Sequence, residues 1–137
     1  MYRYKYAILV LIMGIIHVVP AHTTDLCATV NQQLTSALKK NYASLISKSL
    51  NGKVNPSKVE VDSIMQSGTW TIVYASTPIA DPGYFFFDSS TGKNLFKDVW
   101  GGIAEKGEAA EIEKWALNLG ANKAISSCFA YTVAIAD

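Results

Sequence analysis

Apolar residues recur along residues 24–50 at steps of three and four, with polar residues between them. This spacing predicts one amphipathic helix, because residues three and four apart share a helix face. Thr24 or Asp25 is suited to cap its start. Asn51-Gly52 is suited to end it in a left-handed turn.

After residue 55 the apolar residues alternate with polar ones, which is typical of β-strands. The pattern predicts four strands joined by turns rich in Gly, Pro, Asn, Asp and Ser. The predicted strands cover residues 59–63, 69–76, 84–87 and 93–100. The first two are expected to form a hairpin, and residues 78–83, which include two prolines, are expected to form a rigid loop.

Two further elements follow Gly101-Gly102, which interrupts the fourth strand. Residues 108–119 are predicted as a second helix, since acidic residues crowd its first turn and Gly120 suits its C-terminal cap. Residues 124–136 are almost entirely apolar and are predicted as a fifth strand, in the middle of the sheet or at a covered edge. The order α-β-β-β-β-α-β predicts an α+β fold, an antiparallel sheet of about five strands with two helices packed on one face.

The aromatic and β-branched residues of the third and fifth predicted strands indicate apolar side chains on both faces of this sheet. Two helices cover only one face, so the second face needs another cover. Three arrangements would supply one: a curled sheet that fills its own concavity, a surface for a protein or a second copy, and a small-ligand pocket.

The start of the chain predicts export. Two basic residues precede an apolar run over residues 7–19, and Val19-Pro20-Ala21 supplies small residues for a cleavage site. We therefore expect residues 1–21 to be a secretory signal peptide and residues 22–137 to be a single α+β domain. A retained membrane anchor is the alternative, but the run is shorter than the roughly 20 residues that span a bilayer.

Removal of residues 1–21 leaves ten lysines, eleven acidic residues, no arginine, and His22 as the only histidine. A near-neutral surface without arginine is poorly suited to nucleic acid, so we expect no such partner. Ser-His-Asp, Cys-His and histidine-containing zinc sites need an internal histidine, so we expect no catalytic site of these kinds, no metal and no cofactor. We also expect no stable membrane insertion after signal removal.

Cys27 and Cys128 are the only cysteines and lie near opposite ends of the exported chain. In an oxidising compartment an isolated pair predicts a disulfide bond. Two buried thiols or a reactive thiolate are the alternatives, although no neighbouring histidine is present to activate a thiolate. The bridge is expected to pin the start of the first helix against the last strand.

Asp81, Asp88 and Asp98 are the side chains available for acid–base chemistry, because they flank aromatic runs whose burial would raise a carboxyl pKa. Their alternative role is that of turn residues at strand ends, where Asp is favoured. Aromatic residues supply the main candidates for binding, since Trp and Tyr at loops are typical anchors of a partner protein. The expected places are residues 78–83 and the corner after Trp100, and the candidate binding residues are Ile79, Asp81, Tyr84 and Trp100.

A resemblance to small exported bacterial proteins is carried by four segments, residues 83–88 (GYFFFD), 99–102 (VWGG), 111–115 (EIEKW) and 127–130 (SCFA). Some of those proteins resemble immunity proteins, which neutralise a rival's toxin in the periplasm. The resemblance includes no catalytic motif and implies a periplasmic or secreted inhibitor.

These patterns together predict an exported, non-enzymatic binding domain that blocks a partner sterically. The expected partner is a protein, either a toxin or an enzyme, or a second copy of the chain. A carrier of a small apolar ligand and a hydrolase that uses only carboxylates are the alternative functions.

Overall fold

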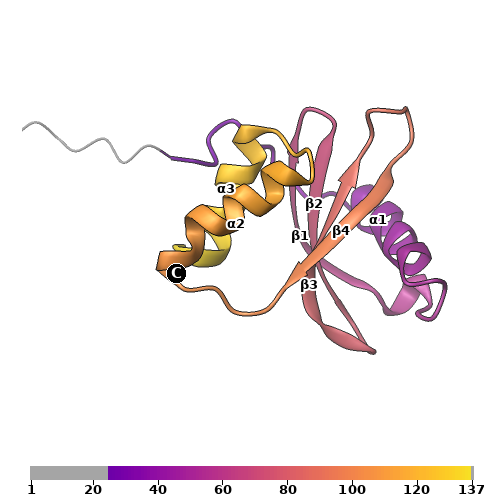
Figure 1. Ribbon diagram of the computed structural model, residues 1–137. Coiled ribbons are helices and arrows are strands. Elements are labelled where there is room, and N and C mark those ends of the chain that lie inside the picture. Colours follow the sequence, from indigo (N-terminus) through magenta and orange to yellow (C-terminus); the bar gives the residue numbers. More distant parts are fainter. Residues whose placement is uncertain (1–24, 137) are drawn as a thin grey trace, which may run out of the picture.

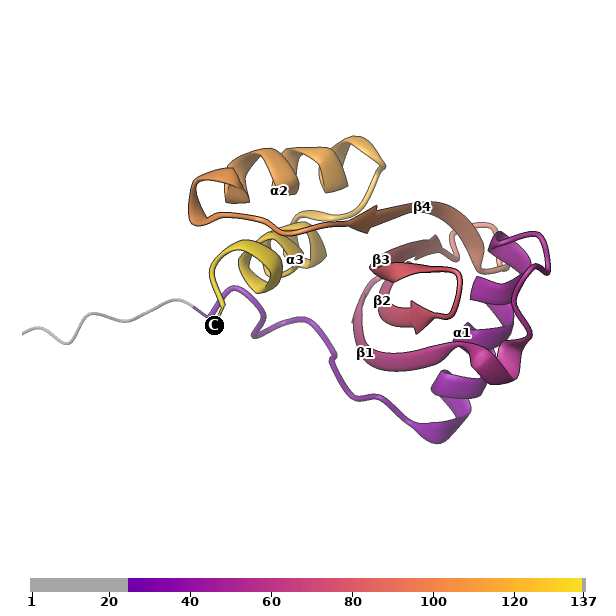
Figure 2. The same cartoon turned by 90° about the horizontal axis from the view of Figure 1, so that it is seen from below.

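The computed structural model describes residues 25–136, and the predicted signal peptide with its cleavage site lies outside them. Within the described residues, a four-stranded antiparallel sheet in the order β1-β2-β3-β4 lies between helix α1 on one side and helices α2 and α3 on the other (Figure 1). Figure 2 shows the curvature of the sheet between these two helical layers. The α+β class and the antiparallel sheet agree with the prediction.

The sheet is a meander of three hairpins. Its strands are β1 (Glu60–Ser67), β2 (Trp70–Thr77), β3 (Ala80–Asp88) and β4 (Leu95–Gly101). The predicted loop 78–83 is mostly strand, because β3 already pairs with β2 at Ala80. Pro82 is tolerated there because the register shifts at this point, and a proline at a bulge interrupts no regular ladder hydrogen bond.

Helix α1 (Ser36–Ser49) begins twelve residues later than predicted. The hydroxyl of Thr35 accepts the N–H of Leu38 at 3.2 Å and so caps the helix there, instead of Thr24 or Asp25. The residues ahead of it form a turn and then a bridge, in which Asn31 pairs with Gln66 of β1. The predicted end of the helix is confirmed, since Asn51 and Gly52 both have positive φ angles.

Helix α2 (Ala109–Asn118) confirms the predicted second helix, and two short 3₁₀ turns, η1 (Pro56–Lys58) and η2 (Lys106–Glu108), precede β1 and α2. The predicted fifth strand is wrong, because residues 124–136 mostly belong to helix α3 (Lys123–Ala134). Asn122 caps this helix by accepting the N–H of Ile125 at 3.0 Å. A helix buried on most sides is apolar all round and resembles a buried strand in sequence.

The two faces of the sheet hold two separate cores. On one face Tyr42 and Ile46 of α1 pack over Val73, Phe85 and Phe87. On the other face α2 and α3 pack over a core that contains the side chains alternating with these, such as Ile72 and Phe86. The prediction of helices on one face only is therefore wrong, because α1 covers one face while α2 and α3 cover the other.

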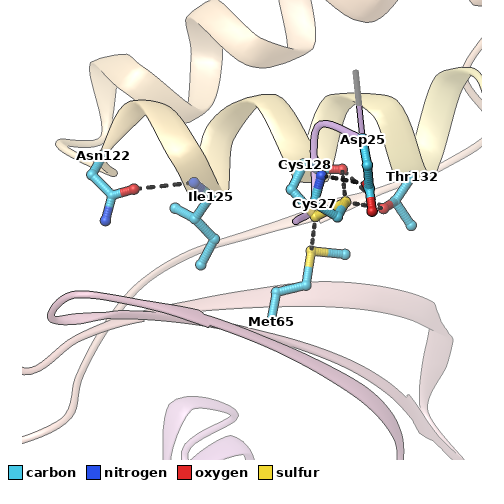
Figure 3. Close-up of a disulfide and its surroundings, with 7 residues drawn as sticks. All are labelled: Asp25, Cys27, Met65, Asn122, Ile125, Cys128 and Thr132. Atoms are coloured by element: carbon cyan, nitrogen blue, oxygen red, sulfur yellow. Dashed lines mark hydrogen bonds between the residues drawn. A yellow bond between two sulfur atoms is a disulfide. The ribbon is translucent and has the colours of Figure 1, made fainter. Parts of the chain in front are cut away.

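The predicted disulfide joins Cys27 to Cys128, whose Cα atoms lie 4.7 Å apart (Figure 3). Cys128 is fully buried on α3, and its sulfur lies 3.9 Å from the sulfur of Met65 on β1. Thr132, one turn further along α3, donates its hydroxyl to the Cys128 carbonyl at 2.9 Å. Cys27 lies in a turn ahead of α1, so the bridge ties this turn to a helix, rather than a helix start to a strand.

Candidate binding surface

Tyr84 and Trp100, two of the four predicted binding residues, are brought together by the pairing of β3 with β4. They are direct partners in the register, and their ring centroids lie 6.1 Å apart. Tyr74 of β2 lies on the other side of Tyr84, and the centroids of these two rings are 4.6 Å apart. Phe129 of α3 packs edge-on against Tyr84 and Trp100. Three strands therefore present a row of aromatic rings to α3.

Glycines allow the chain to pass close to this row. A Cβ atom on Gly83 would lie 3.0 Å from Cγ2 of Val99 and 3.2 Å from the carbonyl oxygen of Trp100, so β3 and β4 meet there only without a side chain. Gly102 has a φ of 114°, which glycine adopts without strain, and it turns the chain out of β4 toward η2. The predicted corner after Trp100 is therefore a sharp exit from the sheet.

Two open hollows adjoin Trp100 on either side of this exit. The first, called here the aromatic hollow, has a volume of about 270 Å³ and is lined among others by Tyr74, Tyr84, Trp100, Ile103, Thr132 and Val133. The second, called here the acidic hollow, has a volume of about 300 Å³ and is lined by Trp100, Ile103, Glu108, Glu111, Ile112 and Trp115. Trp100 and Ile103 belong to both hollows, so the two form one continuous surface.

Ile103 is the most exposed large apolar residue within residues 25–136, with 98% of its surface accessible. It follows Gly102 and lies on the rim that the two hollows share. Trp100, which lines both hollows with it, is only half-buried. An exposed aliphatic side chain and a partly accessible indole therefore share one surface with a hollow on each side.

Burial raises the pKa of the Tyr84 phenol above its ordinary value of 10.0, and the neighbouring Tyr74 raises it further. The phenol is therefore uncharged at neutral pH. An uncharged hydroxyl can both donate and accept a hydrogen bond, so the aromatic hollow offers an apolar wall with a polar group on it.

The other two predicted binding residues lie elsewhere. Ile79 is 54% exposed at the β2–β3 turn, and Asp81 is exposed near the start of β3. Neither residue lines the aromatic or the acidic hollow. The structure thus joins Tyr84 to Trp100 and leaves Ile79 and Asp81 at the far end of the hairpin.

The three aspartates considered for acid–base chemistry make local hydrogen bonds or face solvent. Asp88 accepts both the hydroxyl and the N–H of Ser90, and the hydroxyl bond is the main reason why the pKa of Asp88 lies below its usual value. Asp98 accepts the N–H of its neighbour Val99 at 2.8 Å, and Asp81 is exposed. The lowered pKa of Asp88 is opposite to the change that a general acid needs.

Several residues of this surface were not predicted as binding residues, among them Tyr74, Ile103, Glu108, Glu111, Trp115, Thr132 and Val133. The place of Tyr74 on this surface could have been predicted from the register of the β2–β3 hairpin, because Tyr74 is the cross-strand partner of Tyr84. Thr132 and Val133 reach the hollow only because residues 123–134 are helical. Ile103 has no sequence signal beyond its place after two glycines.

A third depression lies away from Trp100, between α1 and β1. This groove has a volume of about 620 Å³, and its lining includes the apolar Val59 and Val61 and the charged Lys39, Lys40, Glu60 and Asp62. Across residues 25–136, no three His, Cys, Asp or Glu side chains are grouped so that they could hold a metal ion. Nor does any helix in this part of the chain have the length and apolar character needed to cross a bilayer.

Comparison of the chain with protein-family models, with curated proteins and with solved structures finds no match. Its function must therefore be inferred from its own residues.

Proposed function

We propose that this chain is an exported, non-enzymatic protein-binding domain that acts by covering a site on its partner. The observation that carries the proposal is the exposure of Ile103, at 98%, on a rim between two hollows that share Trp100. A partner that covers this rim removes the isoleucine and the indole from water together, and such burial is the main favourable term in association.

The most concrete form of this function is a periplasmic inhibitor or immunity protein whose partner is a toxin or an enzyme. It is supported by the resemblance of residues 83–88 and 99–102, which contain Tyr84 and Trp100, to small exported bacterial proteins. The bond between Cys27 and Cys128 agrees with an oxidising compartment, where such bonds persist. The apolar run near the start of the chain supports export.

A partner that contacts the side chains of this surface fits it better than a partner that adds a strand to the sheet at its β4 edge. The register of β4 shifts at Lys97, so this edge is bulged at a lysine. Asp98 also occupies the N–H of Val99, at 2.8 Å. Bulges and lysines are the usual means by which an edge strand avoids pairing. We therefore place the partner over Trp100 and Ile103, and not along β4.

The second candidate function is that of a carrier of a small apolar ligand. It is favoured by the groove of about 620 Å³ between α1 and β1, whose apolar residues include Val59 and Val61. The groove is also lined by Lys39 and Lys40 and by Glu60 and Asp62, so a ligand with an apolar body and a polar end without net charge would match it. The third alternative, a hydrolase based on carboxylates, has no comparable support, because the pKa of Asp88 is lowered.

The proposal is tested by affinity capture of partners from the envelope fraction of the source cells. The bait is the purified, disulfide-bonded protein, compared with Ile103→Asp and with Ile79→Asp. Ile79 is a matched control because it is also an exposed isoleucine, at 54%, but lies at the β2–β3 turn. We expect one protein to be retained by the unmodified chain and by Ile79→Asp, and its recovery to fall at least about tenfold for Ile103→Asp.

Equal recovery of the partner protein with both variants would mean that it binds away from the rim. Loss of the partner with Ile79→Asp alone would mean that it binds at the β2–β3 turn. Native mass spectrometry of the same preparation separates the two candidate functions. A bound lipid-sized molecule without any retained protein would favour the carrier.

A further inference from the structure

We infer that the acidic hollow receives a basic side chain, preferably an arginine, of the partner protein. This inference rests on the proposed function and specifies which chemical group the partner inserts beside Ile103. The hollow has a volume of about 300 Å³, and its lining combines the indoles of Trp100 and Trp115 with the carboxylates of Glu108 and Glu111. No lysine lines it.

The two indoles are held in place by the core beneath them. Trp100 packs edge-on against Phe129 with centroids 5.6 Å apart, and Trp115 packs edge-on against Phe86 with centroids 5.1 Å apart. Both indoles remain half-buried, so part of each ring faces the hollow. Buried Ile112 also lines the hollow and adds an apolar surface to it. The walls are thus rigid and ready for a flat or elongated group.

The carboxylates come from the start of α2 and from the turn before it. Glu108 accepts the N–H of Glu105 at 2.7 Å through Oε2, in a capping box that sets the direction of its side chain. Glu111 stands one turn further along, exposed. A carboxylate accepts several hydrogen bonds, so Glu108 keeps acceptor capacity for an incoming donor.

The charge of the lining decides between possible occupants. An apolar side chain in the hollow would remove two carboxylates from water without giving either of them a partner, which is unfavourable. An anionic group would be repelled by both. A cation is attracted by the carboxylates and also by the faces of the indoles. The guanidinium group of arginine suits this lining best, because it is flat, stacks on aromatic rings and forms forked hydrogen bonds to carboxylates.

The charges around the hollow agree with this occupant. Residues 98–113 contain five acidic side chains and a single lysine, Lys106. In contrast, residues 36–59 include α1 and η1 on the opposite side of the sheet, and they contain five lysines and no acidic residue (Figure 1). Lys97 and Lys114 flank this segment and Lys123 begins α3, so the excess of negative charge is confined to the surroundings of Trp100 and Ile103. There it would attract a basic group of the partner.

The test is an NMR titration of the purified, disulfide-bonded protein with N-acetyl-arginine methylamide. The readouts are the indole N–H signals of Trp100 and Trp115, with buried Trp70 at the β1–β2 turn as an internal control. N-acetyl-citrulline methylamide is the matched probe, since it has the shape of arginine without the charge. We expect saturable shifts of Trp100 and Trp115 with arginine, and an affinity roughly tenfold lower with citrulline.

Two variants distinguish arginine binding in the acidic hollow from a general attraction to the negative charges of the surface. Glu111→Gln is expected to weaken arginine binding by roughly threefold, the scale of an exposed ion pair. Glu113→Gln is the control, because Glu113 lies on the same helix but pairs with Lys123 and does not line the hollow. Equal binding of arginine and citrulline would overturn the inference, as would equal effects of the two variants or the absence of any shift.

Failure of this inference can be told from failure of the proposed function. If arginine does not bind but capture of a partner still depends on Ile103, the rim binds a partner. The inference that the partner inserts a basic side chain is then wrong. If arginine binds and no partner is captured by any form of the protein, the hollow recognises a basic group and the proposed function is wrong.

Discussion

The side-chain amide of Asn122 donates a hydrogen bond to the carbonyl of Ser67 at 2.8 Å, across a sequence separation of 55 residues. Its oxygen accepts the N–H of Ile125 at 3.0 Å. One side chain therefore both caps α3 and fastens the start of that helix to the β1–β2 turn. Because α3 lines the aromatic hollow through Thr132 and Val133, this amide also helps to position the candidate binding surface.

Replacement of Asn122 is expected to lower the free energy of unfolding in steps. Asn122→Ala removes both hydrogen bonds and should cost about 2 kcal/mol, because a lost cap costs about 1 kcal/mol and a lost hydrogen bond costs a similar amount. Asn122→Asp keeps the cap but loses the donor and should cost less. Urea unfolding of the three proteins measures this. Equal losses for the two variants would mean that the cap contributes nothing.

Reduction of the disulfide is expected to destabilise the protein by about 4–5 kcal/mol in the chain-entropy model, since the bridged residues are 101 positions apart. Urea unfolding with and without reductant measures the difference. Cys27→Ser should be tolerated better than Cys128→Ser, because Cys128 is fully buried whereas Cys27 is half-buried. A hydroxyl without a partner in the core adds a desolvation cost to the loss of the bond. Equal effects of the two serines would contradict the burial of Cys128.

Tyr84 makes stability fall at high pH. Burial raises the pKa of its phenol above 10.0, so the unfolded chain releases this proton at a lower pH than the folded protein does. The stabilisation is complete below the unfolded value and is lost as the pH rises through the higher folded value. Urea unfolding across this alkaline range should show a steeper decline for the unmodified protein than for Tyr84→Phe. Parallel declines would mean that Tyr84 titrates equally in both states.

Lys97 is expected to keep β4 from pairing with a second copy. Phe96 and Val99 on the same strand are 40% and 43% exposed, and the register shift at Lys97 separates them. Lys97→Val would leave an apolar edge, so we expect self-association that rises with protein concentration in sedimentation experiments. Lys93→Val, in the β3–β4 turn, removes the same charge and should remain monomeric. Association of both variants would assign the effect to charge alone.

The elements that can be predicted from sequence alone are those whose apolar residues repeat with one clear period and whose ends are marked by one clear capping or turn residue. The β1–β2 hairpin and α2 have both. The region of α3 has neither, because it is apolar on nearly every side and fits both the helical and the strand period. Asn122 was the available signal, since an Asn directly before an apolar run caps a helix. The start of α1 was misplaced because Thr24 and Thr35 are equally good caps by type.

The candidate binding surface could be predicted only in part, for a related reason. Tyr84 and Trp100 stand out as aromatic residues near a proline-containing segment and a glycine corner. That they meet depends on a register with a shift at Lys97, which nothing in the residue pattern specifies. The exposure of Ile103 depends on how Gly102 directs the chain out of the sheet, and an isoleucine in sequence suggests burial instead.

The bond between Cys27 and Cys128 also determines what a protease can do to this molecule. The exposed turn between β2 and β3 includes Ile79, and a single cut there would divide the described chain into a piece with β1 and β2 and a piece with β3 and β4. Each piece contains one of the two cysteines, so they would remain one covalent molecule. The severed ends would still be held by the paired strands on both sides. A nicked form of this protein would therefore keep its hollows assembled.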